Sequence, residues 1–345
     1  MFEPRYSLNK KLLDNFVRIR QIVETLNKKR LPHLALLKFE KEARAISAYA
    51  STSIEGNPLP LTDVKRVLKS RPKYIRDTER EVINYNEALI YLDSILKKKP
   101  EPVTKDFICL IQKIITRSLI DKKNNGFIRK NAVVVNNPKT RKVIYLPPDP
   151  KDVARLTKEL LDFLKNKYDN LDPLILAGIF HKQFVIIHPF MDGNGRTARL
   201  VTKYLLARMG LNTFNLFSFE NYYNKNITKY FEHVGVFGDY YETEKLVDFT
   251  QWLSYFTDGI IDELLRVQKL LAVPDIKERI SAHEKVIITY VKKHGSISES
   301  DYAIITRRAR STRILDFKRL VKKNILERYG KGKATYYVLS NTTES

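Results

Sequence analysis

The sequence predicts a mainly α fold with a smaller domain of helices and strands at its C-terminus. Two observations support this prediction. Apolar residues recur every three or four positions through most of the 345 residues, which is typical of amphipathic helices. Two segments instead read as pairs of short strands around a turn, one near residue 135 and one near residue 330.

The first 77 residues form the predicted N-terminal helical region. The segments "LLDNFVRIRQIVETL" and "LLKFEKEARAISAYASTSIEGN" both carry the helical repeat of apolar residues. Gly56, Asn57 and Pro58 end the second segment, because glycine, asparagine and proline stop helices. We therefore expect two long helices before residue 58.

Residues 78–265 are predicted as a helical core that a single β-hairpin interrupts. Its helices include "REVINYNEALIYLDSIL", "KDFICLIQKIITRSLI" and "DPLILAGIFHKQFVII". Residues 128–148, "IRKNAVVVNNPKTRKVIYLPP", contain two β-branched runs around an Asn-Asn-Pro turn, which predicts a hairpin.

After a predicted linker at 266–277, residues 278–345 show three helical segments followed by two short strands around a glycine-lysine turn. This order is typical of a winged helix, a relative of the helix-turn-helix DNA readers. Residues 277–345 hold 16 Lys and Arg against 7 Asp and Glu, so +9 of the chain's net charge of +23 lies there. DNA is therefore one expected partner of 278–345, and protein docking or dimerisation is the alternative.

Composition bounds the class of protein. The length favours two or three domains, and no run of about eighteen uncharged apolar residues predicts a membrane span. The beginning, "MFEPRYSLNKKLLDNF", has charges where a signal peptide has an apolar stretch. Cys109 is the one cysteine, which excludes disulfides within the chain and cysteine-rich zinc sites. We therefore expect a soluble, cytoplasmic protein.

The segment "FVIIHPFMDGNGRTARL", residues 184–200, predicts an anion site between two helices. Gly193 and Gly195 allow left-handed backbone angles and a close approach to a ligand, and the helix that follows points its free N–H groups at the same place. Arg196 and Arg199 lie one turn apart on that helix, where two guanidinium groups can bind a polyphosphate.

Two further side chains of this segment add chemistry to the anion site. Asp192 is placed to bind Mg²⁺, which prefers one or two carboxylates together with phosphate oxygens. His188 is the group that can accept a proton near neutral pH. The combination predicts a nucleotide site with a base and without a protein nucleophile.

The segment "HPFMDGNGRTAR" matches at every fixed position the signature of Fic-domain proteins, His-x-Phe-x-Asp/Glu-Gly-Asn-Gly-Arg-x-x-Arg. The segments "HKQFVIIHPF", "GFIRKNAVVV" and "YLPPDPKDV" are also similar to this family, and the resemblance spans about residues 1–265. It implies an all-helical domain, ATP as the substrate, and transfer of AMP to a Ser, Thr or Tyr hydroxyl of a target protein.

The resemblance also implies roles for individual residues. His188 would deprotonate the target hydroxyl, Phe190 would pack in the core, and Asp192 would hold Mg²⁺. The 128–148 hairpin resembles the family's flap, which docks an extended target segment by strand addition. The remaining expected nucleotide contacts are Gly193, Asn194, Gly195, Arg196, Arg199, Tyr222 and Tyr223.

A second motif lies far upstream. The segment "STSIEGN", residues 51–57, resembles the inhibitory motif Ser/Thr-x-x-x-Glu-Gly/Asn of the family's self-inhibited class. Ser51 and Glu55 occupy its fixed positions, and the resemblance implies that Glu55 pairs with Arg199 and displaces the γ-phosphate. An ordinary helix end with a solvated glutamate is the alternative.

The sequence therefore predicts a self-inhibited protein adenylyltransferase that uses ATP and Mg²⁺ and carries a winged helix at 278–345. A family enzyme that removes AMP or transfers another group is one alternative. A DNA-binding regulator whose helical core only senses nucleotide is another. Self-modification and a homodimer stay open.

Overall fold

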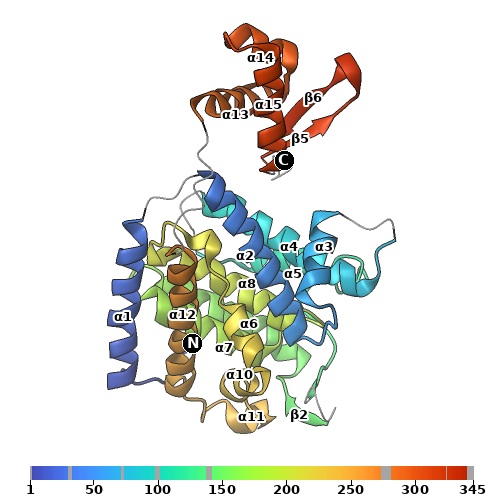
Figure 1. The fold of residues 1–345 in the computed structure, drawn as a ribbon. Coiled ribbons are helices and arrows are strands. Elements are labelled where there is room, and N and C mark those ends of the chain that lie inside the picture. The colour runs from blue at the N-terminus through green and yellow to red at the C-terminus, as the bar shows by residue number, and fades with distance from the viewer. Residues whose placement is uncertain are drawn as a thin grey trace. The chain divides into compact units, whose positions relative to one another are not determined.

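The computed structural model describes residues 2–29, 33–70, 74–97, 102–136, 142–272, 281–323 and 325–339. The described residues are mainly helical, as the sequence predicts, with a few short strands (Figure 1). They fall into two compact units, one formed by residues 2–29 and 42–272 and the other by 33–41 and 281–339. The predicted domain bounds of 1–77, 78–265, 266–277 and 278–345 stay predictions.

The first unit is a bundle of helices. Its longer helices are α1 (Lys10–Asn27), α2 (His33–Ile54) from residue 42 onward, α3 (Leu61–Lys69), α4 (Asp77–Leu96), α5 (Lys105–Ile115), α6 (Pro150–Lys167), α7 (Pro173–Ile187), α8 (Asn194–Leu206) and α12 (Thr250–Leu270). Shorter elements are α9 (Glu220–Lys225), α10 (Ile227–Val234), α11 (Tyr240–Thr243) and 3₁₀ turns at Ala207–Met209 and Phe214–Leu216.

Helices α7 and α8 lie at the centre of this bundle. Helix α7 is mostly apolar and almost wholly buried, and α8 is buried over nearly its whole length. Helices α4, α5, α6 and α12 pack around them. Gly178 lets α12 approach α7 closely, and the Trp252 indole donates a hydrogen bond of 2.7 Å to the Gly178 carbonyl. The loop that joins α7 to α8 is therefore held by a rigid core.

A small sheet lies at the edge of the first unit. Its strands are β1 (Val135–Asn136), β2 (Val143–Leu146) and β3 (Gly238–Asp239), in the order β1-β2-β3. The antiparallel pairing of β1 with β2 confirms the predicted strands of the hairpin, while its turn, residues 137–141, lies outside the described residues. The parallel pairing of β2 with β3 was not predicted, because β3 has only two residues and no strand pattern.

The C-terminal part contains α13 (Ala282–His294), β4 (Ile297–Ser298), α14 (Glu299–Ile305), α15 (Arg310–Lys322), β5 (Leu326–Tyr329) and β6 (Tyr336–Leu339). The strands form an antiparallel sheet in the order β4-β6-β5. Capping boxes at Ser281 and Ser298 begin α13 and α14. A separate apolar core includes Ile287, Ile297, Phe317 and Leu320. The sequence pattern did not predict strand β4.

The first residues of the predicted linker at 266–277 lie in a helix. Helix α12 continues to Leu270, because Leu264 and Val267 extend its buried stripe. Residues 273–280, which hold the end of the predicted linker and the start of the predicted 278–345 domain, lie outside the described residues, as do 324 and 340–345. Among the helices that the structure describes, none is long and apolar enough to cross a membrane.

Candidate active site

The loop between α7 and α8 has a backbone fixed by its own side chains. His188 ends α7 with a left-handed backbone (φ 54°), and its N–H still donates to the Phe184 carbonyl at 3.0 Å. The Asn194 amide accepts from the Phe190 N–H at 2.9 Å and donates to the Phe190 carbonyl at 2.8 Å. Gly193 is also left-handed (φ 81°), where a side chain would be strained. The loop therefore presents one defined shape, with the Phe190 ring fully buried beneath it.

The His188 imidazole is held in one tautomer. Its Nδ1 lies 3.1 Å from the Val185 carbonyl oxygen, which can only accept, so Nδ1 carries the proton and Nε2 keeps a lone pair. Burial lowers the pKa of His188 below its usual value of 6.5. The ring is therefore neutral at physiological pH and can accept a proton at Nε2.

Arg129, which sequence analysis did not single out, fixes the backbone around His188. The side chain is almost fully buried, and its guanidinium donates to the carbonyls of His188 at 2.8 Å, Asn131 at 3.0 Å and Pro148 at 2.6 Å. The backbone N–H of Arg129 donates to the Pro189 carbonyl at 2.9 Å. One buried cation therefore ties both ends of the β1–β2 hairpin to the residue that carries the base.

Arg199 is fully buried and is bound by the end of α2. Its guanidinium donates to Ser51 Oγ at 2.8 Å, to the Ser51 carbonyl at 2.9 Å and to Glu55 Oε1 at 2.6 Å. A longer contact of 3.4 Å joins it to the Tyr230 hydroxyl. Burial acts to lower the pKa of Arg199, but the groups around it, with Glu55 foremost, together raise that pKa. The structure thus brings the two distant motifs together.

The Glu55 carboxylate lies at the start of α8, above Gly195. A Cβ atom at Gly195 would overlap Glu55 Oε1 and lie 3.1 Å from Arg199 Nη1. The absence of a side chain at Gly195 therefore leaves room for an anion beside the helix N-terminus and the Arg199 guanidinium, which is a favourable place for negative charge. In this structure the anion is a side chain of the chain itself.

Arg196 is bound by two carboxylates. It donates to Asp192 Oδ2 at 3.0 Å and forms a second ion pair with Glu81 of α4, which sequence analysis missed. Glu81 also accepts from Asn57 Nδ2 at 2.7 Å, so it connects Arg196 to the segment that follows α2. Burial raises the pKa of Glu81, and the Arg196 charge opposes that rise. The motifs gave no signal for Glu81, because it lies 115 positions from Arg196.

Asp192 fits the requirements of a Mg²⁺ ligand that works together with phosphate oxygens. Its side chain is 47% exposed, and its backbone carbonyl is fixed by Gln112 Nε2 at 3.1 Å. Among the described residues, no group of three or more His, Cys, Asp and Glu side chains could hold a metal ion by itself. Any ion here would therefore depend on oxygens of a bound ligand.

The two tyrosines predicted as nucleotide contacts differ in position. Tyr223 is fully buried, and its ring stacks on Tyr230 with centroids 4.5 Å apart. In this conformation Tyr223 is a core residue, because its side chain packs against His181 of α7 and Trp252 of α12. Tyr222 is only partly buried and packs on Tyr255 at 5.3 Å, so it keeps an accessible edge.

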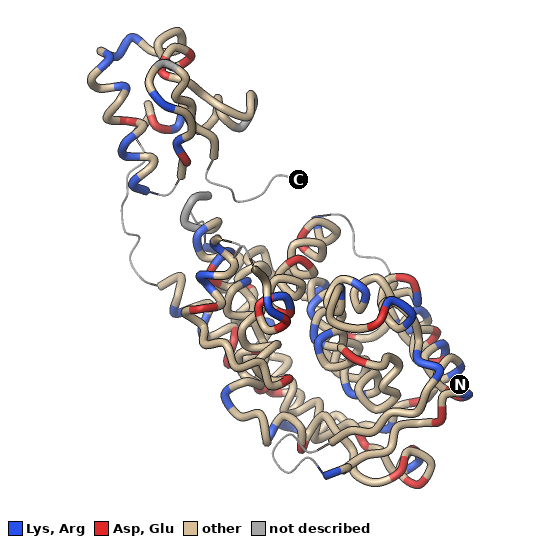
Figure 2. Tube along the Cα trace, turned by 90° about the vertical axis from the view of Figure 1, so that its right-hand side faces the viewer, with Lys and Arg blue, Asp and Glu red and all other residues tan. Residues whose placement is uncertain are grey.

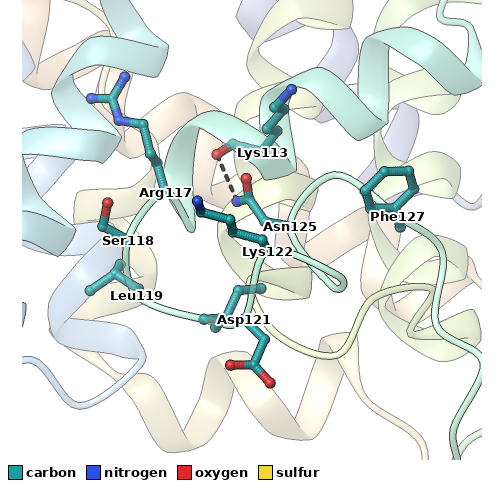
Figure 3. Close-up of a pocket in the computed structure, with 9 residues that line it drawn as sticks. Lys113, Arg117, Ser118, Leu119, Asp121, Lys122, Asn125 and Phe127 are labelled. Atoms are coloured by element: carbon teal, nitrogen blue, oxygen red, sulfur yellow. Dashed lines mark hydrogen bonds between the residues drawn. The ribbon is translucent and has the colours of Figure 1, made fainter.

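A hollow of about 680 Å³ lies apart from these groups, at the end of α5 and in the turn that follows it (Figure 3). Its wall includes Lys113, Arg117, Lys122, Asn125 and Phe127. Asn125 donates to the Lys113 carbonyl at 3.0 Å and thereby fixes the turn. None of the residues singled out in the loop at 188–199 lines this hollow, so we do not assign the reaction site to it.

Residues 102–206 match the model of the Fic/DOC family. The chain is 33% identical over 218 residues to the Protein adenylyltransferase Fic of Drosophila willistoni, a match that covers 57% of this chain and 42% of that protein. It is 31% identical over 222 residues to the Drosophila melanogaster protein of the same name, covering 59% and 43%. The chain thus spans less than half the length of these curated relatives.

Solved structures confirm the fold. A Fic family protein from Desulfovibrio desulfuricans G20 matches over the whole of both chains with a TM-score of 0.67 and 19% identity. Fic-1 of C. elegans, residues 134–508, matches 75% of this chain and 72% of that one with a TM-score of 0.59 and 22% identity. The mainly helical arrangement of the first unit is therefore that of Fic proteins.

Proposed function

We propose that this chain is a protein adenylyltransferase that moves AMP from ATP to a Ser, Thr or Tyr hydroxyl of a target protein, and that Glu55 inhibits it. The observation that carries the proposal is the anion position at the start of α8, where the carboxylate of Glu55 lies against Gly195 and Arg199 close to a neutral, oriented His188. The relatives named as protein adenylyltransferases support the choice of AMP.

The reaction needs a base and a set of fixed positive charges. His188 Nε2 would take the proton from the target hydroxyl as its oxygen forms a bond to the α-phosphorus. The bond from the α-phosphorus to the bridging oxygen then breaks, and pyrophosphate leaves with the electron pair. The amides at 193–195, Arg196 and Arg199 would stabilise the charge on the phosphates, because they are already oriented before the ligand binds.

Mg²⁺ would be held by Asp192 together with phosphate oxygens, and its charge would offset that of the triphosphate. Asp192 now accepts hydrogen bonds from Arg196 and from the Gly193 N–H at 2.6 Å. Those bonds fix its carboxylate at the mouth of the loop. The residues present therefore suit the ion, and the main cost of binding it is weakening the contact with Arg196.

The hairpin at 128–148 supports docking of an extended target segment. Strand β2 is paired on both sides, with β1 and with β3, so of the two hairpin strands β1 is the one at an edge of the sheet. Val143 and Leu146 of β2 and Phe237 just before β3 are 53%, 43% and 58% exposed. An added strand would gain main-chain hydrogen bonds and cover apolar surface.

Inhibition would follow from competition for one place. Glu55 fills the space above Gly195 and engages Arg199, so a phosphate group that needs both cannot bind productively while the carboxylate is there. Ser51 binds the same guanidinium through its hydroxyl and its carbonyl. The alternative of an ordinary solvated helix end does not account for a buried arginine at this carboxylate.

The test is incubation of the whole chain with α-labelled ATP and Mg²⁺ in the presence of cell lysate, followed by mass spectrometry of the labelled proteins. We expect AMP on hydroxyl side chains, with more label from Glu55→Gly than from the wild type. The Asp192→Ala variant should lose the Mg²⁺-dependent reaction and keep its helical circular dichroism. A folded Glu55→Gly chain that transfers no AMP, to itself or to any lysate protein, would contradict the proposal.

A further inference from the structure

Helix α15 of the C-terminal part has one buried face and one exposed face. Asp316, Phe317 and Leu320 are buried against the rest of this part of the chain, and the Tyr302 hydroxyl donates to Asp316 at 3.0 Å. The Phe317 ring stacks on Tyr337 with centroids 4.2 Å apart. The opposite side of α15 is therefore fixed toward solvent.

The basic residues around α15 divide into two groups. Some are used inside the fold: Arg313 donates to Glu299 at 2.8 Å, Arg308 lies 3.2 Å from Asp316, and Lys323 lies 3.0 Å from Glu284. These three ion pairs are partly or largely buried, and they join α15 and the residues next to it to α13 and α14. Their charges serve the structure and are not available to a partner.

The second group lies on the exposed face. Lys318, Arg319 and Lys322 are exposed, and within the described residues no carboxylate forms an ion pair with them. Arg310, at the start of the helix, is 79% exposed. Its contact with an acidic residue is long, with 4.0 Å between Arg310 Nε and Glu299 Oε2. The Lys and Arg residues of this part of the chain are drawn in blue in Figure 2. The exposed charges of α15 itself are all positive, because its one acidic residue, Asp316, is buried.

The exposed face also carries small and apolar side chains in its first half. Ile314 and Leu315 are 37% and 48% exposed, and Ser311 is exposed one turn before them. Four residues, Thr306–Ala309, separate α14 from α15, which is the spacing of a helix-turn-helix pair. In such pairs the first half of the second helix meets base edges, where serine can hydrogen-bond and aliphatic groups contact the thymine methyl.

We propose that the exposed face of α15 binds double-stranded DNA. Arg310, Ser311, Ile314 and Leu315 would lie in the major groove, and Lys318, Arg319 and Lys322 would contact phosphates. A protein partner is disfavoured, because a stripe of like charges without acidic residues among it is complementary to a polyanion and not to a mixed protein surface. This inference does not depend on AMP transfer.

The test uses the full chain and a fluorescent 30-base-pair duplex of mixed sequence, with binding measured by anisotropy at several salt concentrations. The Lys318→Ala, Arg319→Ala, Lys322→Ala triple variant should reduce the slope of log K against log salt by about three, roughly one for each lost phosphate contact. The control is Lys105→Ala, Lys165→Ala, Lys167→Ala, which removes the same charge from exposed positions on α5 and α6. It should change the slope by less than about one.

Three outcomes would overturn the proposal. Equal losses in the two triple variants would mean that only the overall charge of the chain attracts DNA. A flat salt response of the wild type would mean that phosphates are not contacted. Unchanged DNA binding by the α15 variant, combined with loss of self-association in sedimentation, would assign the face to protein docking. Because all three side chains are exposed, circular dichroism and melting should show that the variants fold.

Discussion

The arginines at the start of α8 and the basic residues of α15 can both bind an anion, but they differ in burial and in their present partners. Arg196 and Arg199 are 4% and 0% exposed, and each is already paired with a carboxylate of the chain. Lys318, Arg319 and Lys322 are exposed and form no ion pair among the described residues. The first pair must exchange one anion for another, whereas the second set only has to lose counterions.

The difference predicts opposite responses to the same perturbations. A buried arginine stripped of its carboxylate keeps its charge in a place with little water, so it binds the next anion strongly. An exposed lysine is screened by salt and contributes little on its own. Changes at the loop should therefore act on one ligand with large effects, and changes on α15 should act gradually and with salt.

The largest effect is expected at the base. His188→Ala should leave ATP affinity nearly unchanged and reduce AMP transfer by about 10² to 10⁴, because the target hydroxyl loses its proton acceptor. Single-turnover labelling together with ATP titration would measure both quantities. Transfer at the wild-type rate would remove His188 from the chemistry and leave the loop as an anion site only.

The second effect is a gain. Glu55→Gly should raise labelling by about tenfold to a hundredfold, because a charge-assisted contact of about 1.5 to 3 kcal/mol no longer holds Arg199. Glu55→Gln is the matched control, since it keeps the size of the side chain and removes its charge.

The gain should require the arginine. Glu55→Gly combined with Arg199→Ala should return to low labelling, while Glu55→Gly alone should melt at a lower temperature, because a buried guanidinium has lost its partner. Labelling at or below the wild-type level, with melting unchanged, would show that Glu55 is an ordinary helix end.

The third effect concerns pH. Burial holds the pKa of His188 below 6.5, and a base is active above its pKa, so the acid limb of kcat/KM should have its midpoint below pH 6.5. The measurement is the pH profile of Glu55→Gly, in which inhibition does not interfere. An acid limb centred above pH 6.5 would mean that His188 is more exposed to water than the structure shows.

The smallest effect is expected from removing the Tyr223 hydroxyl. The Tyr223 hydroxyl has no hydrogen-bond partner among the described residues, so Tyr223→Phe should change the free energy of unfolding by less than about 1 kcal/mol and leave ATP affinity unchanged. Tyr223→Ala should cost about 3 to 5 kcal/mol, because a large buried ring is removed. A marked loss of ATP affinity in Tyr223→Phe would return that residue to the nucleotide site.

The sequence pointed most directly to the site residues whose contacts lie within a few positions along the chain. Asn194 bonds to Phe190 and Arg196 to Asp192 across four positions, so one short segment contains both the residues and their geometry. Glu55 and Arg199 are 144 positions apart, and only the resemblance to a known motif connected them in advance.

Other contributions could not be found this way. Arg129 acts through main-chain carbonyls, which no residue type reveals, and Glu81 stands in an ordinary helical pattern. Tyr222 and Tyr223 are adjacent on a short helix, so only the packing of α9 decides which of them enters the core.

In the fold, the helices could be predicted from their apolar repeats. Strands β3 and β4 could not, because each pairs with a strand far along the chain.

The room above Gly195 makes Glu55 a tethered competitor. Its effective concentration at the start of α8 is set by the chain and does not change with dilution or with the amount of protein. The concentration of a free anion that needs the same place does change. The fraction of molecules in which Glu55 releases Arg199 would then depend on the ratio of the free-anion concentration to the effective concentration of Glu55. The contact between Glu55 and Arg199 would therefore set the ligand concentration above which Arg199 becomes available.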